Sequence, residues 1–259
     1  MSASENIIGV LMTNNDKSVK DLIIKARKEV LINKNYFKAL ISISEIEKTN
    51  ALNDEEKLFL KNTAALAYLE NKEYNKAAEL YKEINENYQA GFCELLLGNE
   101  QEAERLWHNA PDAPACQWGK CLLDFIKLKK GKKPTFFQIR NHLETDIGYF
   151  IQANRIKYTE NLIKHDELFM SVNLESYKLI GRTLLNYGFF NMARKYLLKS
   201  LQILPNEAET LYFLGRYYYL TGAYRECQIT LGKCLESNFD YTPARELLAK
   251  TELKLDNIW

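Results

Sequence analysis

Six residues in the second half of this sequence have types and a spacing that could recognise an acidic or aromatic peptide. They form two sets that lie 34 residues apart: Lys178, Arg182 and Leu185, and then Tyr212, Arg216 and Tyr219. The spacing within each set places its members on one face of an α-helix. Lys and Arg donate charge-assisted hydrogen bonds to carboxylates, and Tyr rings attract cations. We therefore expect a peptide-binding groove at these six residues; the alternative is a solvated face whose Tyr rings only cover neighbouring aliphatic surface.

Motifs for catalysis and for metal binding are missing from the sequence. His108, His142 and His165 lie far apart, and there is no H-E-x-x-H, no cysteine–histidine metal spacing, no G-x-S-x-G and no Walker phosphate loop. Residues that are distant in sequence can still converge in space, so the missing motifs make an enzyme less expected but do not exclude one. The sequence predicts no enzyme, no cofactor and no metal site.

One dense cluster of positive charge suggests a second kind of chemistry. It consists of Lys127, Lys129, Lys130, Lys132 and Lys133. Such a cluster could contact the phosphates of a nucleic acid or of an anionic membrane. It could equally be a solvated loop after a helix whose C-terminal dipole favours cations. A phosphate- or nucleic-acid-contacting module is therefore the alternative to peptide binding.

The helices that would position the six groove residues are predicted from a sequence pattern that occurs twice between residues 177 and 239. The first copy has Tyr177, Ile180, Gly181, Leu184, Gly188, Phe190, Ala193, Leu197, Ser200 and Pro205, and the second has Leu211, Leu214, Gly215, Tyr218, Gly222, Tyr224, Cys227, Leu231, Cys234 and Phe239. Each copy predicts two amphipathic helices joined by a turn, because apolar residues recur at i, i+3, i+4 and i+7. Gly222 favours the end of a helix. Small residues at Gly181 and Gly215 allow the paired helices to approach closely.

This pattern resembles the tetratricopeptide repeat (TPR), a helix, turn, helix unit of 34 residues. The resemblance implies an all-α fold: a right-handed α-solenoid, or superhelix, of antiparallel helix pairs. It also implies that the first helix of each unit lines a concave groove, where a scaffold or adaptor binds a peptide or protein partner. A TPR chaperone for a secreted or assembling protein is a narrower version of the same function.

One specialised TPR group, the co-chaperones, grips a terminal carboxylate with Lys and Asn residues. Lys178 matches one of the clamp lysines. Arg182 and Phe213 stand where the clamp has asparagines, and Pro243 and Leu247 stand where it has its other basic residues. We therefore do not expect carboxylate-clamp binding.

The rest of the chain repeats the pattern more weakly. We predict a flexible segment over residues 1–16 and a single solenoid over 17–259. Within the solenoid we expect clear repeats at 174–207 and 208–241, weaker repeats at 20–53, 58–85 and 86–112, an irregular part at 113–173 and a closing helix at 242–255. In the irregular part, residues 147–164 are expected to form one longer helix.

Composition supports an intracellular protein and dictates no particular partner. The chain has 259 residues, with 35 basic and 34 acidic side chains, so its overall charge does not favour nucleic acid. Five cysteines without C-x-x-C spacing indicate reduced core residues. The apolar run at 7–12 is too short to span a membrane. The sequence thus predicts a cytoplasmic, reducing location, no membrane span, and self-association as a further possibility.

Overall fold

A computed structural model describes residues 19–49, 51–110 and 112–256 of the chain. The regular secondary structure of these residues is helical, and no strand is found among them. The predicted flexible segment at 1–16 lies outside the described residues. Where the sequence predicts one solenoid, the contacts divide the chain into two compact units, with the division between Gly119 and Lys120, inside the helix Pro114–Ile126.

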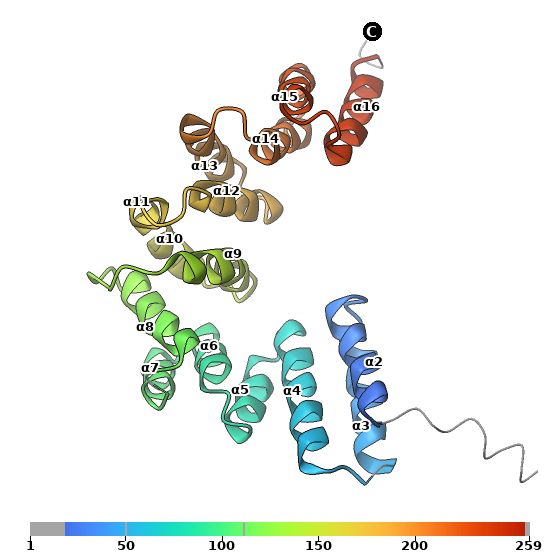
Figure 1. Ribbon diagram of the computed structural model, residues 1–259, viewed down its shortest axis with the longest axis vertical. Coiled ribbons are helices and arrows are strands. Elements are labelled where there is room, and N and C mark those ends of the chain that lie inside the picture. Colours follow the sequence, from blue (N-terminus) through green and yellow to red (C-terminus); the bar gives the residue numbers. More distant parts are fainter. Residues whose placement is uncertain (1–18, 50, 111, 257–259) are drawn as a thin grey trace, which may run out of the picture. The chain divides into compact units, whose positions relative to one another are not determined.

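Unit 1 is built from helical hairpins (Figure 1). Its helices are α2 (Val19–Leu31), α3 (Tyr36–Thr49), α4 (Asp54–Glu70), α5 (Tyr74–Glu83), α6 (Asn87–Leu97), α7 (Glu100–His108) and the first part of α8 (Pro114–Ile126). The pairs α2–α3, α4–α5 and α6–α7 pack together, and α5 also packs on α6. Trp107 of α7 is fully buried, and a side-chain carbon at Gly91 or Gly119 would collide with its ring.

Unit 2 continues the hairpins with a more regular spacing. After the rest of α8 it contains α9 (Phe136–Gln152), α10 (Ile156–Leu162), the 3₁₀ helix η1 (Ile163–His165), α11 (Asp166–Met170), α12 (Ser176–Asn186), α13 (Phe190–Ile203), α14 (Ala208–Leu220), α15 (Tyr224–Ser237) and α16 (Thr242–Asp256). The helices α12 and α13 pack as one pair, α14 and α15 as the next, and α16 covers α15. The helix pairs α12–α13 and α14–α15 lie within 174–207 and 208–241, the spans of the two clearest expected repeats, and α16 lies at the span of the expected closing helix.

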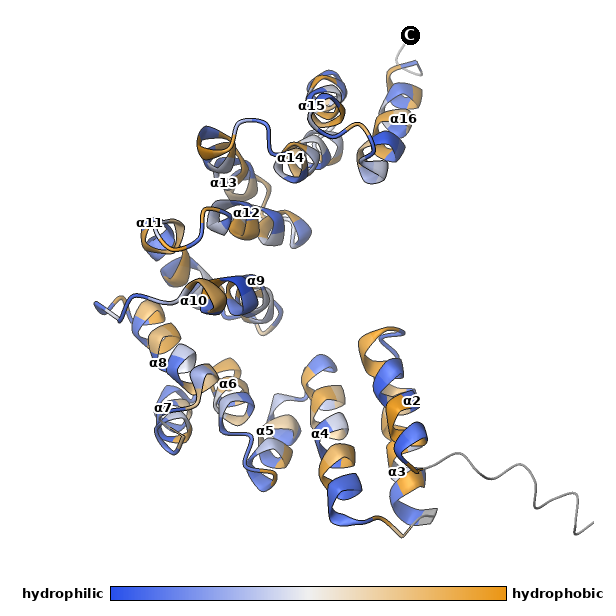
Figure 2. Cartoon of the chain, viewed as in Figure 1, coloured by the Kyte–Doolittle hydropathy of each residue, from blue (hydrophilic) through white to orange (hydrophobic). Residues whose placement is uncertain are grey.

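The close helix crossings predicted at Gly181 and Gly215 are confirmed. A Cβ at Gly181 would lie 2.9 Å from Leu197 Cγ on α13, and one at Gly215 would lie 2.6 Å from Leu231 Cδ2 on α15. Apolar residues run in stripes along the helices (Figure 2), as amphipathic packing requires. Burial of one stripe against the neighbouring helix is what holds each hairpin together.

The expectation of one helix over 147–164 is wrong, because the chain turns at Asn154 with a left-handed φ of 56°. Gly188 and Gly222, which lie 34 and 68 residues further on, have φ of 81° and 78° at the equivalent turns. The residues that precede and follow Asn154 match the other two copies and are buried: Leu143, Ile147, Phe150, Thr159 and Ile163. Residues 136–170 are thus a third hairpin of the same spacing.

Among the described residues, none of the helices combines the length and the apolar character needed to cross a membrane. With its helix pairs and left-handed turns 34 residues apart, the chain has an all-α, TPR-like helical-repeat fold. The handedness of the predicted superhelix stays a prediction.

Candidate binding surface on the first helices of unit 2

The six predicted groove residues lie on α12 and α14, which are the first helices of successive hairpins. The helix α14 packs against α12 on one side and against α16 on the other. Side chains that project from equivalent positions of these three helices therefore form one surface, which we call the first-helix face. Its members are Arg182 on α12, Tyr212, Arg216 and Tyr219 on α14, and Glu246, Lys250 and Leu253 on α16.

Lys178 and Leu185 are buried instead of lying on this face. Leu185 is 2% exposed and Lys178 is 5% exposed. Lys178 Nζ lies 2.9 Å from Glu175, 2.8 Å from Glu209 and 3.4 Å from Glu207. Burial alone would lower the pKa of Lys178, but the hydrogen bonds to Glu209 and Glu175 and the charge of Glu207 raise it. Lys178 is therefore charged and already neutralised by its own chain.

Arg182 is held by two carboxylates from neighbouring helices. Its Nε and Nη2 donate to Glu144 on α9, at 2.7 and 2.5 Å, and its Nη1 donates to Glu209 on α14 at 2.6 Å. Paired and bidentate guanidinium groups of this kind are strong and geometrically fixed. Arg182 thus ties three successive first helices together, and little of its charge remains for a ligand.

Arg216 occupies the equivalent place on α14 but has a different hydrogen-bond partner. Its Nη1 donates to the side-chain oxygen of Asn186 at 3.1 Å, and its guanidinium lies 5.8 Å from the centre of the Phe213 ring. Within the described residues it pairs with no carboxylate, and it is partly exposed. Arg216 therefore carries an uncompensated positive charge on the first-helix face.

Aromatic rings border Arg216 one turn away on either side. Tyr212 packs against Tyr241, which precedes α16, with 5.4 Å between the ring centres. Tyr219 packs against Tyr224 at 5.7 Å. Both Tyr212 and Tyr219 are partly exposed. These contacts hold the two rings in place, which leaves flat aromatic surface beside the guanidinium.

Three residues of the first-helix face were not identified from the sequence. Glu246 lies 34 residues after Tyr212, Lys250 lies 34 residues after Arg216, and Leu253 lies 34 residues after Tyr219. All three are exposed on α16, Leu253 to 63%. The signal that could have found them is the same spacing, continued into the closing helix. The face therefore extends beyond the predicted groove by an acidic, a basic and an apolar position.

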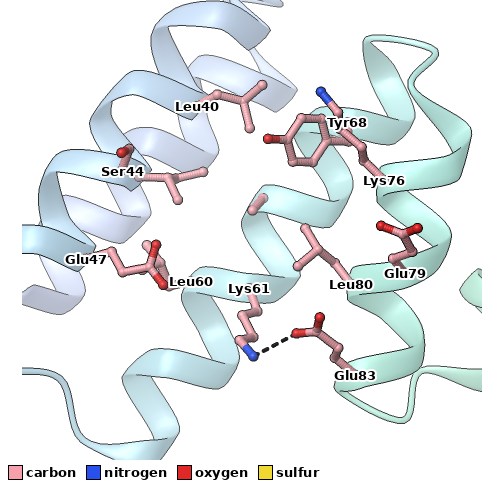
Figure 3. A pocket seen from close by; sticks show the side chains of 12 residues that line it. Leu40, Ser44, Glu47, Leu60, Lys61, Tyr68, Lys76, Glu79, Leu80 and Glu83 are labelled. Carbon is pink, nitrogen blue, oxygen red and sulfur yellow. Dashed lines mark hydrogen bonds and ion pairs between the residues drawn. The ribbon is translucent and has the colours of Figure 1, made fainter.

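Unit 1 has a cleft of about 490 Å³ between α3, α4 and α5 (Figure 3). Leu40 from α3 and Leu80 from α5 approach it from opposite sides, and Lys61 on its rim pairs with Glu83 at 2.8 Å. Unit 2 has a corresponding cleft of about 750 Å³ between α13, α14 and α15. Because the same kind of cleft recurs where two second helices flank a first helix, it is a regular product of hairpin stacking.

The three histidines lie on separate elements and have local roles. His108 Nδ1 is 2.7 Å from the carbonyl of Glu104 one turn earlier on α7. His165 Nε2 is 3.2 Å from the carbonyl of Phe125 near the end of α8. Burial lowers the pKa of His142 on α9. Across the described residues, no three His, Cys, Asp or Glu side chains are grouped so that they could hold a metal ion.

No protein-family model matches the chain, and no curated protein matches it in sequence. Among solved structures it is similar to the TPR domain of P58(IPK), with a TM-score of 0.37 and 14% identity over 93% of this chain and 80% of that one. It is also similar to the APC/C hetero-tetramer Cut9-Hcn1, with a TM-score of 0.40 and 14% identity over 94% of this chain and 44% of that one. The complex of the TPR2AB domain of yeast Sti1 with pHSP90 gives a TM-score of 0.34 and 13% identity over 90% and 98% of the two chains.

Proposed function

We propose that this protein is a non-enzymatic scaffold or adaptor whose first-helix face binds an acidic segment of a peptide or protein. The observation that carries the proposal is the contrast between Arg182 and Arg216. The two occupy equivalent positions, yet Arg182 is paired with Glu144 and Glu209, whereas Arg216 pairs with no carboxylate among the described residues. A partly desolvated guanidinium beside aromatic rings is a favourable site for a carboxylate from another molecule.

The surroundings of Arg216 specify more than charge. Tyr212 and Tyr219 offer aromatic surface on the same helix, and Leu253 offers aliphatic surface on α16. Tyr and Arg are also the residue types that contribute most often to interface hot spots. The expected ligand is therefore a segment in which an Asp or Glu lies next to an apolar or aromatic residue.

The cysteines support the proposed reducing, cytoplasmic location. All five are thiols that form no disulfide within the described residues, and all five are buried. Burial raises the pKa of Cys93 to about 12 and that of Cys234 to about 11. Thiols with such values stay protonated and unreactive, which suits packing residues of a reduced protein.

Selection from a peptide library tests the proposed surface. A phage-displayed library of random peptides, panned against the whole protein, should enrich sequences with an acidic residue beside an apolar one. Arg216→Glu should weaken the selected peptides by about 10- to 100-fold, because a hydrogen bond to a charged group is replaced by repulsion. The measurement is fluorescence anisotropy of a labelled peptide.

Arg225→Glu is the matched control, since Arg225 is exposed on α15 and the substitution changes the net charge equally. It should leave peptide binding unchanged. If Arg216→Glu binds the selected peptides as tightly as the wild type does, the first-helix face is not the binding surface. Arg182 is unsuitable for this test, because its substitution would break the ion pairs to Glu144 and Glu209 and so affect stability.

A further inference from the structure

A second surface of unit 2 lies where the chain passes from α8 to α9. We call residues 127–137 the basic loop. The loop contains the five lysines of the cluster identified in the sequence. Of these, Lys129, Lys130, Lys132 and Lys133 are exposed, and none of the four forms an ion pair with another described residue. Arg140, one turn into α9, is also exposed and adds a further cation.

Three large apolar side chains accompany these cations at the surface. Leu128 is 49% exposed, Phe136 is 40% exposed and Phe137 is 69% exposed. The rings of Phe136 and Phe137 meet edge to face, with 5.6 Å between their centres. Exposed apolar residues are common singly, but three of them within one cationic loop need a reason.

The basic loop is fixed at both ends, so its side chains are presented by an ordered backbone. The amide of Lys129 donates to the carbonyl of Asp124 at 2.8 Å, and Asn161 donates to the carbonyl of Ile126 at 2.7 Å. At the other end Pro134 is buried. Thr135 and Gln138 form a capping box that starts α9, with the Thr135 amide 2.9 Å from Gln138 Oε1.

Leu128 has a backbone conformation that leucine disfavours. Its φ is 55°, in the left-handed region where a glycine usually ends a helix. Gly98, Gly188 and Gly222 occupy such positions after α6, α12 and α14. Lys34 and Lys72 also take a left-handed φ after α2 and α4, so this conformation is a common helix ending in the chain. Leu128 differs from them in presenting a large apolar side chain to solvent.

We propose that the basic loop binds the surface of an anionic phospholipid bilayer. The lysines lie at the level of the lipid phosphates, while Leu128, Phe136 and Phe137 enter the interface between headgroups and acyl chains. Two signals of this kind, a basic patch and apolar side chains, together give reversible attachment to a membrane surface. A lipid surface explains the aliphatic Leu128, which could not stack on a base as an aromatic residue would in a nucleic-acid site.

Co-sedimentation with vesicles tests the proposal. The whole protein should bind vesicles of phosphatidylcholine mixed with phosphatidylserine and should bind vesicles of phosphatidylcholine alone much more weakly. Replacing Lys129, Lys130, Lys132 and Lys133 together by Ala should weaken binding by roughly fivefold for each lysine removed. Added salt should weaken the wild type in the same direction.

Leu128→Gly separates lipid binding from folding. The substitution removes both the strain and the apolar side chain, so the protein should melt at a higher temperature and bind the mixed vesicles more weakly. Phe137→Ser should weaken binding by about tenfold or more through lost apolar contact. Ile229→Ser is the apolar control, because Ile229 is 61% exposed on α15. The charge control replaces four other exposed cations together by Ala: Arg194, Lys195, Arg225 and Lys233. Neither control should change vesicle binding.

Several outcomes would overturn the proposal. One is equal binding to vesicles with and without phosphatidylserine, and another is binding to mixed vesicles that survives the four lysine substitutions. A third is that the control substitutions weaken binding as much as the substitutions in the basic loop do. Tight binding of single-stranded RNA that Leu128→Gly leaves intact would assign the loop to nucleic acid instead. Because the first-helix face takes no part, Arg216→Glu should bind vesicles as the wild type does.

Discussion

At Gly181 the backbone of α12 comes so close to Leu197 on α13 that a methyl group has no room. A Cβ there would lie 2.9 Å from Leu197 Cγ and 3.1 Å from the Leu197 backbone nitrogen, which cannot move aside as a side chain can. Gly232 on α15 is the opposite case, since nothing lies within 4 Å of its Cβ position. The two glycines are both helical and differ only in this space.

Gly181→Ala should therefore lower the free energy of unfolding by about 1–2 kcal/mol, because overpacking outweighs the better helix propensity of Ala. Gly232→Ala should raise it by about 0.5–1 kcal/mol, since only the propensity changes. Urea unfolding followed by circular dichroism measures both. A stabilised Gly181→Ala variant would mean that α12 and α13 pack less closely than the structure shows.

The residue scale also shows where prediction from sequence stops. The glycines at the helix crossings could be predicted, because both Gly181 and Gly215 recur in a local pattern. The different ion pairing of Arg182 and Arg216 could not be predicted. They are identical in the repeat, and the difference arises from Glu144 and Glu209. These carboxylates lie 38 residues before and 27 residues after Arg182 and reach it only through packing of α9 and α14 on α12.

At the scale of elements, the third hairpin shows how a repeat can be hidden. Its spacing matches that of the other two, but Ile147 stands in place of Gly181, Asn154 in place of Gly188 and Thr159 in place of Ala193. Asn is one of the few other residues that tolerate a left-handed φ, so the turn survives without glycine. The second helix is also interrupted by η1, which breaks the apolar periodicity that identifies a helix.

The carboxylates that tie the first helices together should make stability depend on pH. Burial alone would raise the pKa of Glu209, but the charges of Lys178 and Arg182 and their hydrogen bonds lower it. A group whose pKa is lower in the folded state stabilises the fold above its unfolded value, about 4.3, and loses that contribution as pH falls through the folded value.

Glu209→Gln should thus lower the free energy of unfolding at neutral pH by about 1–2 kcal/mol, since the ion pairs keep some contact with water. The difference from the wild type should shrink as pH falls below about 4. Glu226→Gln is the control, because Glu226 is exposed on α15 and forms no ion pair within the described residues. Denaturant unfolding at several acidic pH values measures the difference in free energy of unfolding between Glu209→Gln and the wild type. A difference that does not change with pH would contradict the ion-pair network.

At the scale of the whole molecule, the two units should respond separately to a local change. Each hairpin contacts only its neighbours, so destabilisation is expected to spread over nearby repeats and then fade. Gly181→Ala should speed amide hydrogen exchange in α12 to α15 and leave α4 to α7 of unit 1 unchanged. Hydrogen exchange read by mass spectrometry gives this map. A uniform increase along the chain would show that the two units unfold together.

The position of the tryptophans makes one of the units visible to a simple optical method. Trp107 and Trp118 are fully buried, and both belong to unit 1, whereas the third, Trp259, is the final residue of the chain. Unit 2 contains many of the tyrosines instead, with Tyr212, Tyr217, Tyr218 and Tyr219 on α14 alone. Excitation at the long-wavelength edge of the aromatic absorption band selects indole rings over phenol rings. A red shift of that emission therefore reports the exposure of Trp107 and Trp118 in unit 1. Circular dichroism reports the helices of both units, so a helix signal that changes before or after the emission shows that the two units unfold at different times.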